Sequence, residues 1–231
     1  MTKIPMIDLA AQHAEIEEEL LQGFAEVMAS GRFVLGEPVA AFETELAKLC
    51  ETRHAVGCNS GTDALWLALR ALGIGPGDAV LCPAYSFFAS AAAIVRVGAT
   101  PVFVDIDPVT LNLDPEDAIR RAEATPAVRA VLTADLFGRI AELGPLEAWC
   151  RERDIPILED AAQSIGAVDA EARPVGACAR IACFSFYPTK NLGALGDAGA
   201  LVTEDADLRQ RVAQLRIHGE SEPCLLYTSD A

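Results

Sequence analysis

The sequence has little positive charge. Its 231 residues include 18 lysines and arginines against 34 aspartates and glutamates, which gives a formal net charge of −16. Proteins that bind nucleic acid or anionic membranes hold phosphates with clusters of basic side chains, and no basic face is evident here. We therefore expect no nucleic-acid or membrane partner. A small anion is not excluded, because a few amides and cations are enough to hold one.

Patterns typical of metal sites, disulfide frameworks and targeting segments are also missing. The 7 cysteines form no C-x-x-C pair, and the 3 histidines are scattered, so a zinc site has little support. The odd number of cysteines favours buried, reduced thiols in a cytoplasmic protein. The N-terminal stretch is acidic, so no signal peptide is predicted, and no apolar run is long enough to span a bilayer.

The hydrophobic content of 52% and charged content of 23% are typical of a globular protein. Short apolar runs alternate with amphipathic segments, which predicts an α/β fold with a mostly parallel sheet and helices on both faces. Ligands in such folds gather beyond the carboxyl ends of the strands. The strands are predicted at 54–58, 79–82, 101–105, 130–134, 156–159, 181–186 and 200–203. The helices are predicted at 7–29, 38–50, 62–72, 86–97, 114–123, 143–153 and 205–217.

One polar turn leads from the first predicted strand straight into a helix, and it contains Ser60, Gly61 and Thr62. Unpaired amides and hydroxyl groups at a helix N-terminus can hold an anion. The same residues are also common helix N-caps, and from the turn alone capping is the simpler interpretation. The turn lacks the G-K-[ST] ending of a Walker phosphate loop.

Two further turns carry candidate ligand groups. Asp160 follows the fifth predicted strand, where it could hold a protonated ring nitrogen or cap a helix. Gln163 could donate to a phenolate oxygen or cap the same helix. The turn after the second strand contains Tyr85, Phe87 and Phe88. One of these rings could stack on a flat cofactor, and we expect the other two in the core.

Lys190 is the only lysine after Lys48, and it lies in the apolar, glycine-punctuated stretch IACFSFYPTKNLGALGDAG. A lysine removed from water has a depressed pKa and can act as a nucleophilic amine that forms a Schiff base. Taken alone, an ordinary loop lysine explains the segment equally well. Ser185 adds a hydroxyl group in the same stretch.

These weak signals become informative when they are combined. The ends of the strands of one predicted sheet carry four such groups. They are an anion-binding turn, an acid that could hold a ring nitrogen, an aromatic ring that could stack and a lysine. Together they meet the needs of pyridoxal 5′-phosphate (PLP), which has a phosphate, a pyridine ring and an aldehyde.

The sequence resembles the DegT/DnrJ/EryC1/StrS sugar aminotransferases, within the fold type I, aspartate aminotransferase-like PLP enzymes. The likeness runs from about residue 4 to residue 219. The matching stretches are IPMIDLAAQHAEI, SGRFVLGEPVAAFE, NSGTDAL, GATPVFVDIDPVTLNLDP, DLFG, PILEDAAQSIGA, FSFYPTKNLGALGDAGALVT and LRIHG.

The resemblance implies a role for each matching residue at the cofactor. Lys190 would carry PLP as an imine and shuttle a proton, and Asp160 would pair with the ring nitrogen. Gln163 would bond the 3-oxygen of the ring, and Phe87 would stack on its face. The phosphate would be bound by Gly61, Thr62 and Ser185.

The resemblance also implies substrate contacts and a reaction. Gly31, Phe33 and Thr189 would touch the substrate, and Phe33 stands where some members have a tyrosine. The implied reaction is ping-pong transamination, in which an amino acid, glutamate by expectation, donates its amino group to a nucleotide-linked keto-sugar. Because Lys190 is present, the resemblance argues against the dehydratase branch of the family, where histidine replaces that lysine.

The expected domain organisation is an N-terminal helical segment (1–30), a PLP-binding large domain (31–219) and a tail (220–231) that is non-native or frayed. Family members continue into a smaller C-terminal domain, so the resemblance implies a truncated chain and a homodimer for the full-length protein. One alternative is a non-catalytic fragment, or a regulatory or binding protein on the same scaffold. A nicotinamide-dependent enzyme is less favoured, because no G-x-G-x-x-G turn follows the first strand.

Overall fold

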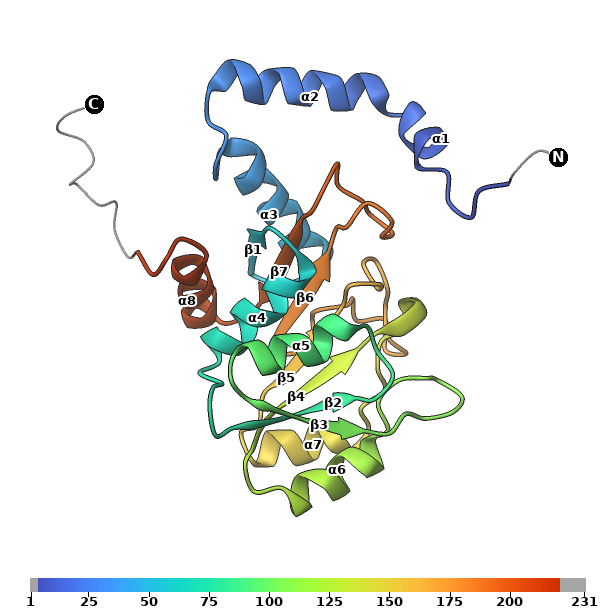
Figure 1. Cartoon of the computed structure of the whole chain (residues 1–231), viewed down its shortest axis with the longest axis vertical. Helices are drawn as coiled ribbons and strands as arrows, with labels where there is room; N and C mark the ends of the chain where they lie inside the picture. The colour runs from blue at the N-terminus through green and yellow to red at the C-terminus, as the bar shows by residue number, and fades with distance from the viewer. Residues whose placement is uncertain (1–3, 221–231) are drawn as a thin grey trace.

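The computed structural model describes residues 4–220, and in this part of the chain seven strands form one sheet (Figure 1). The strand order is β1-β7-β6-β5-β4-β2-β3. The strands are β1 (His54–Cys58), β2 (Ala79–Pro83), β3 (Thr100–Val104), β4 (Val128–Ala134), β5 (Ile157–Asp160), β6 (Ile181–Ser185) and β7 (Gly199–Thr203). All seven lie within two residues of the predicted ranges.

The sheet is mostly parallel, as the alternation predicts, and β7 is the exception. The pairs β2–β3, β2–β4, β4–β5 and β5–β6 are parallel, whereas β7 runs antiparallel to both β1 and β6. Residues 186–198 join β6 to β7 without a helix, so the chain can return directly beside β6. The start of β7 therefore meets the carboxyl ends of β1 and β6 at one edge of the sheet.

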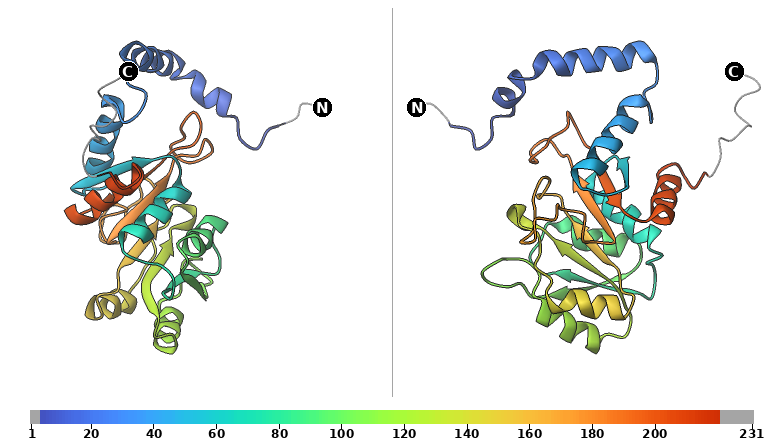
Figure 2. Two further views of the ribbon diagram at one scale, coloured as in Figure 1. Left: turned by 60° about the vertical axis from the view of Figure 1, so that its left-hand side comes forward. Right: turned by 180° about the vertical axis from the view of Figure 1, so that it is seen from behind.

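Helices cover both faces of the sheet, which confirms the predicted α/β architecture (Figures 1 and 2). On one face α4, α5 and α8 pack into a core with β1, β2, β4, β5, β6 and β7. On the other face α6 and α7 pack near β2 and β4, and α3 packs near β6 and β7. The helices are α1 (Leu9–Ala14), α2 (Glu17–Ser30), α3 (Glu37–Leu49), α4 (Gly61–Ala71), α5 (Phe88–Arg96), α6 (Pro115–Ala124), α7 (Pro145–Glu152) and α8 (Ala206–Arg216), with a short 3₁₀ turn η1 (Leu136–Gly138).

The N-terminal segment differs from the prediction of one continuous helix over 7–29. It forms α1 and α2, because Ile16 leaves helical geometry and its amide bonds the carbonyl of His13. Neither helix has a buried residue, and both extend away from the sheet (Figure 2). Phe24 on α2 is 65% exposed. The division at residue 30 stays a prediction, and the tail from 221 lies outside the described residues.

The described cysteines are free thiols, and the expectation that they are buried fails for Cys178, which is exposed. Cys50, Cys82, Cys150 and Cys183 are buried, and burial raises the pKa of Cys82 to about 12. These thiols therefore act as small apolar core residues. Between residues 4 and 220 there is no helix with the length and apolar character that a membrane crossing requires.

Gly199 sets how closely β7 approaches the start of α4. A Cβ at this position would overlap the backbone carbonyl of Ser60. Neither backbone can yield without breaking the β1–β7 pairing, so we expect Gly199→Ala to lower the free energy of unfolding by about 3 kcal/mol. Urea denaturation measures this change.

Gly57 provides the matched control, since it lies on β1, beside β7 in the sheet. A Cβ there would meet only Glu43 Oε1 at 3.5 Å and Val39 Cγ1 at 3.7 Å, which is ordinary contact. Gly57→Ala should change the unfolding free energy by no more than about 0.5 kcal/mol. Equal losses in the two variants would refute the close approach at Gly199.

Candidate active site

A cavity of about 380 Å³ opens at the carboxyl edge of the sheet. The strand ends β4, β5 and β6 and the starts of α4, α5 and β7 surround it. It brings together eight of the ten predicted site residues from four separate stretches of sequence. These eight are Gly61, Thr62, Phe87, Asp160, Gln163, Ser185, Thr189 and Lys190.

The start of α4 forms one wall of the cavity. Ser60 caps this helix, since its hydroxyl oxygen accepts a hydrogen bond from the Asp63 amide at 3.1 Å. The interpretation of the turn as a helix N-cap is therefore right for Ser60. The amides of Gly61 and Thr62 have no intrahelical acceptor and carry the positive end of the helix dipole. Capping and anion binding thus use different groups of the same turn.

Gly61 allows α4 to begin directly against the end of β6. A Cβ on Gly61 would come within 2.6 Å of the Ser185 Cβ, so a larger residue would push the helix start away. Because Gly61 has no side chain, the Ser185 hydroxyl group and the first amides of α4 line the same part of the cavity. This arrangement of hydroxyl and amide donors suits a phosphate.

Asp160 ends β5 at the cavity and is only 8% exposed. Its Oδ2 accepts a hydrogen bond from Ser90 Oγ at 2.7 Å, and its Oδ1 accepts from the Ala162 amide at 3.3 Å. No helix begins after Asp160, so the helix-cap alternative for Asp160 and Gln163 is wrong. Burial raises the pKa of Asp160, while the Ser90 hydrogen bond opposes that rise.

Lys190 lines the same cavity and is partly buried, in the loop after β6. Its backbone amide donates to the carbonyl of Tyr187 at 2.8 Å, which fixes a tight turn. Burial lowers the pKa of Lys190, and the nearby Asp160 carboxylate acts in the opposite direction. The two side chains line one cavity, as an amine and an acid serving a single ring must.

The aromatic turn after β2 is more exposed than we expected. Tyr85 is 49%, Phe87 71% and Phe88 79% exposed, so the expectation of two core rings is wrong. The reason is the position of the turn at the sheet edge, where α5 begins and no described element packs over it. Of the three, Phe87 lines the cavity.

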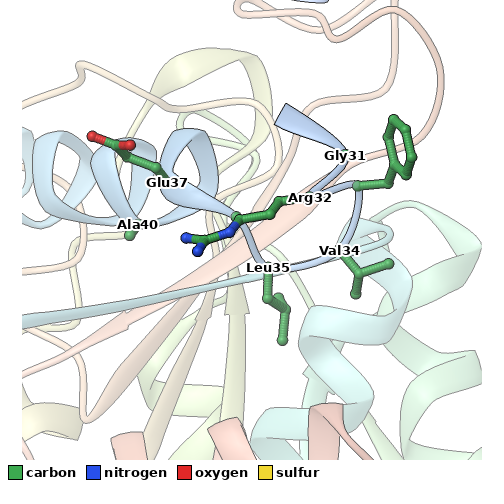
Figure 3. Close-up of a pocket in the computed structure, with 8 residues that line it drawn as sticks. Gly31, Arg32, Val34, Leu35, Glu37 and Ala40 are labelled. Atoms are coloured by element: carbon green, nitrogen blue, oxygen red, sulfur yellow. The ribbon is translucent and has the colours of Figure 1, made fainter. Parts of the chain in front are cut away.

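The remaining predicted residues divide into two groups. Gln163 and Thr189 are exposed at the cavity. Gly31 and Phe33 lie instead in the connection between α2 and α3, which borders a separate hollow that also includes Val34 (Figure 3). The structure therefore does not bring Gly31 and Phe33 to the cavity, and their substrate contacts stay a prediction.

Sequence reasoning missed several polar residues of the cavity. Ser86, Asp135 and Asp197 line it, and Ser90 lies beneath it against Asp160. Ser86 and Ser90 lie within a predicted helical stretch rich in alanine, which gave no signal of a functional role. Asp135 follows a predicted strand, as Asp160 does, so strand-end position was the signal available for it.

The residues present fit pyridoxal phosphate. The cavity offers anion donors at the start of α4, a buried carboxylate, an exposed aromatic ring and a partly buried lysine. Among residues 4–220 no group of histidine, cysteine and acidic side chains is arranged to hold a metal ion. This combination defines the class of the protein as a PLP-binding α/β protein of the fold type I kind.

Comparison with known proteins gives the family. The sequence model of the DegT/DnrJ/EryC1/StrS aminotransferase family matches residues 14–226, and the chain belongs to this family. A dTDP-3-amino-3,4,6-trideoxy-α-D-glucose transaminase of Streptomyces venezuelae is 45% identical over 223 residues, which cover 95% of this chain and 57% of the relative. A UDP-N-acetyl-3-dehydro-α-D-glucosamine 3-aminotransferase of Acidithiobacillus ferrooxidans is 44% identical over 218 residues, covering 94% of this chain and 58% of the relative.

Solved structures agree in fold. The S. venezuelae DesV structure, in complex with a ketimine intermediate, has a TM-score of 0.92 at 43% identity, and covers 96% of this chain and 59% of DesV. A DegT DnrJ EryC1 StrS aminotransferase from Brucella abortus has a TM-score of 0.91 at 39% identity, over 96% of this chain and 61% of that one. The chain thus spans a little over half the length of these relatives.

Asp135 and Glu159 form a buried carboxyl pair beside the cavity. Asp135 is 1% and Glu159 4% exposed, and the carboxyl group of each shifts the pKa of the other. The Gly176 amide donates to Glu159 at 2.9 Å, and the Ala141 amide and Ser164 hydroxyl donate to Asp135 at 3.0 and 3.1 Å. Burial raises the pKa of Asp135 to about 6 and raises that of Glu159 as well.

This pair should make stability depend on pH. The folded protein binds more protons than the unfolded chain between the ordinary Asp135 pKa of 3.8 and its folded value of about 6. The contribution of the protonated Asp135 to the free energy of unfolding is therefore present below pH 4 and is lost as the pH rises through 6. The free energy of unfolding falls by up to about 1.4 kcal/mol per pH unit for each proton. Asp135→Asn should flatten this dependence in thermal unfolding between pH 4 and 7, and identical profiles in both proteins would contradict it.

Proposed function

We propose that this chain carries the cofactor site of a PLP-dependent aminotransferase that transfers an amino group to a nucleotide-linked keto-sugar. The observation that carries the proposal is one cavity that holds Lys190, Asp160 and the open N-terminus of α4. When bound there, PLP supplies an electron sink and carries the amino group from one substrate to the other.

The protein groups have separate tasks in this proposal. The amides of Gly61 and Thr62 and the hydroxyl group of Ser185 bind the phosphate. The Asp160 carboxylate pairs with the ring nitrogen and keeps it protonated. Phe87 covers one face of the ring, and Gln163 donates to the 3-oxygen.

Lys190 has two tasks. Its Nζ atom would hold the cofactor through the aldehyde carbon, with the aldehyde oxygen leaving as water. This bond requires the neutral amine, and burial favours that form by lowering the pKa of Lys190. The same Nζ atom, when free, would act as the general base and acid that moves the proton of the amino acid α carbon. Thr189 lines the cavity and is exposed, and we expect it to contact the substrate.

The names of relatives support a substrate class for the proposal. Both curated relatives described above carry names that place the amino group at carbon 3 of a UDP- or dTDP-linked sugar. We propose a nucleotide-linked 3-keto-sugar as acceptor and glutamate as donor, in amino-sugar biosynthesis for a surface polysaccharide or a secondary metabolite. The thiols described as free fit a cytoplasmic enzyme, where thiols stay reduced.

The test has two stages. Addition of PLP should give a visible absorption band, and borohydride should then fix the cofactor on Lys190, as peptide mass spectrometry detects. Addition of glutamate before borohydride should replace that band by the band of the amine form and leave Lys190 unmodified. Absence of the Lys190 adduct in the first stage would refute the proposed cofactor site.

A regulatory role is the second candidate. A relative of Geobacillus stearothermophilus that is 42% identical over 216 residues carries the name pleiotropic regulatory protein. A chain that binds PLP on Lys190 but shows no glutamate-dependent spectral change would favour this candidate over catalysis.

We also propose that copies of this protein pair as a homodimer. Supporting this, Phe87 and Phe88 stand exposed where α5 begins, and Phe33 and Val34 are 70% and 81% exposed between α2 and α3. Exposed apolar clusters of this kind mark contact surfaces. Sedimentation equilibrium at micromolar concentration should give twice the chain mass, and Phe88→Asp should shift it towards the monomer. A wild-type monomer under these conditions would exclude the pairing.

A further inference from the structure

A chain of two hydroxyl groups leads to the buried Asp160 carboxylate. Ser90 Oγ donates to Asp160 Oδ2 at 2.7 Å, and Ser86 Oγ lies 2.8 Å from Ser90 Oγ. Ser90 is 1% and Asp160 8% exposed, so neither group can exchange this partner for bulk water. Ser90 and Asp160 lie 70 residues apart, and their contact is created by the packing of α5 against the sheet.

The direction of the hydrogen bonds follows from donor counting. An ionised carboxylate can only accept, and a serine hydroxyl group has one proton to give. Because Ser90 gives its proton to Asp160, it must accept the one from Ser86. Ser86 lines the cavity, so the chain runs from the cavity wall to the carboxylate. Aligned hydrogen bonds of this kind strengthen one another.

The Ser90 hydroxyl group does not make the hydrogen bond that is usual for a serine in a helix. Serine side chains in helices often bond a backbone carbonyl one turn earlier, whereas this hydroxyl group points to another element. Ser90 belongs to the first turn of α5, where the helix dipole favours a negative charge. The second oxygen of Asp160 is held by the Ala162 amide. Both oxygens therefore have fixed partners, which sets the plane of the carboxylate.

The electrostatic surroundings make this hydrogen bond important. Burial is the largest influence on the pKa of Asp160 and raises it, and the Ser90 hydrogen bond is the largest opposing one, followed by the Ala162 amide and the Lys190 charge. The other titratable groups around it are the adjoining Glu159, Asp135 at the end of β4 and the thiol of Cys183 on β6. None of these three favours a further negative charge.

We propose that Ser90, itself held by Ser86, is a positioning residue that orients Asp160 and keeps its carboxylate ionised for the cofactor ring nitrogen. The link to the ring nitrogen rests on the function proposed above. The effect on Asp160 itself does not, because it exists in the protein without cofactor.

The decisive experiment uses the cofactor-free chain with ¹³C-labelled aspartate carboxyl groups. NMR titration follows the Asp160 signal, which is assigned by its loss in Asp160→Asn. The titration midpoint should move to higher pH in Ser90→Ala, by less in Ser86→Ala, and should return in Ser90→Thr, which restores the hydroxyl group. Ser164→Ala is the matched control, since it removes a buried hydroxyl group from Asp135 instead and should leave the Asp160 midpoint in place.

PLP titration supplies the second readout. Ser90→Ala should bind PLP about tenfold more weakly, with recovery in Ser90→Thr. The proposal is overturned if the Asp160 titration midpoint in Ser90→Ala equals that of the wild type. Circular dichroism must show for this comparison that Ser90→Thr is folded to the same extent. If no variant and not even the wild type binds PLP, the proposed function fails, while the NMR titration still decides the role of Ser90.

Discussion

Lys190→Ala should abolish the covalent PLP adduct and lower the rate of the glutamate half-reaction by about 10⁴-fold. Loss of the amine removes both the attachment point and the base that moves the proton, and such groups contribute about 10²–10⁴-fold each. Stopped-flow absorbance with glutamate and mass spectrometry after borohydride measure the two effects. Lys190→Arg should be equally inactive, because a guanidinium group does not lose its proton.

Lys48→Ala is the matched control for this variant. Lys48 lies on α3 and does not line the cavity. Its side chain is 79% exposed and its Nζ lies 3.8 Å from Glu45 Oε2. It should retain the adduct and the rate. A borohydride adduct that persists in Lys190→Ala would place the attachment elsewhere and would remove the central residue from the proposed site.

Asp160→Asn should separate cofactor capture from chemistry. The amide keeps the size of the side chain and the Ser90 partner, so Lys190 should still be modified by PLP and borohydride. A neutral amide cannot hold the ring nitrogen protonated, and the half-reaction with glutamate should therefore slow by about 10²–10³-fold. Parallel measurement of adduct yield and of the half-reaction rate provides the test.

Asp197 offers a control of equal charge for this substitution. It lines the same cavity but is exposed, so water screens its charge. Asp197→Asn should change the half-reaction rate by less than about threefold. A rate in Asp160→Asn that equals the wild-type rate would show that the buried carboxylate has no part in activating the ring.

The local pattern of apolar and turn residues was enough to predict the strands of the sheet. Each strand is a short apolar run bounded by turn residues, so its position could be predicted within two residues. Lys190 and Asp160 could be selected because polar residues that follow buried strands are few and must lie at the sheet edge. The break at Ile16 could not be predicted, since neither proline nor glycine marks it.

Tertiary packing determines the exposure and the contacts of residues, and local sequence pattern does not predict these. The exposure of Tyr85, Phe87 and Phe88 depends on which other elements pack over their turn, and the sequence of the turn does not predict this. Likewise, Ser90 resembles any serine in an alanine-rich helix until α5 is placed against β5. The separation of Gly31 and Phe33 from the cavity also depends on the path between α2 and α3.

The sequence by itself determined the α/β class, the order of the elements and the chemical types available at the strand ends. It did so because hydrophobic period, caps and turns are properties of neighbouring residues. The tertiary structure alone decided which of these groups come together. The α4 amides lie beside Ser185, Lys190 and Asp160 line one cavity, and Ser90 bonds Asp160. Contacts between residues tens of positions apart form only when the sheet brings its carboxyl ends to one edge, and the burial that shifts the pKa of Lys190 and Asp160 arises at the same step.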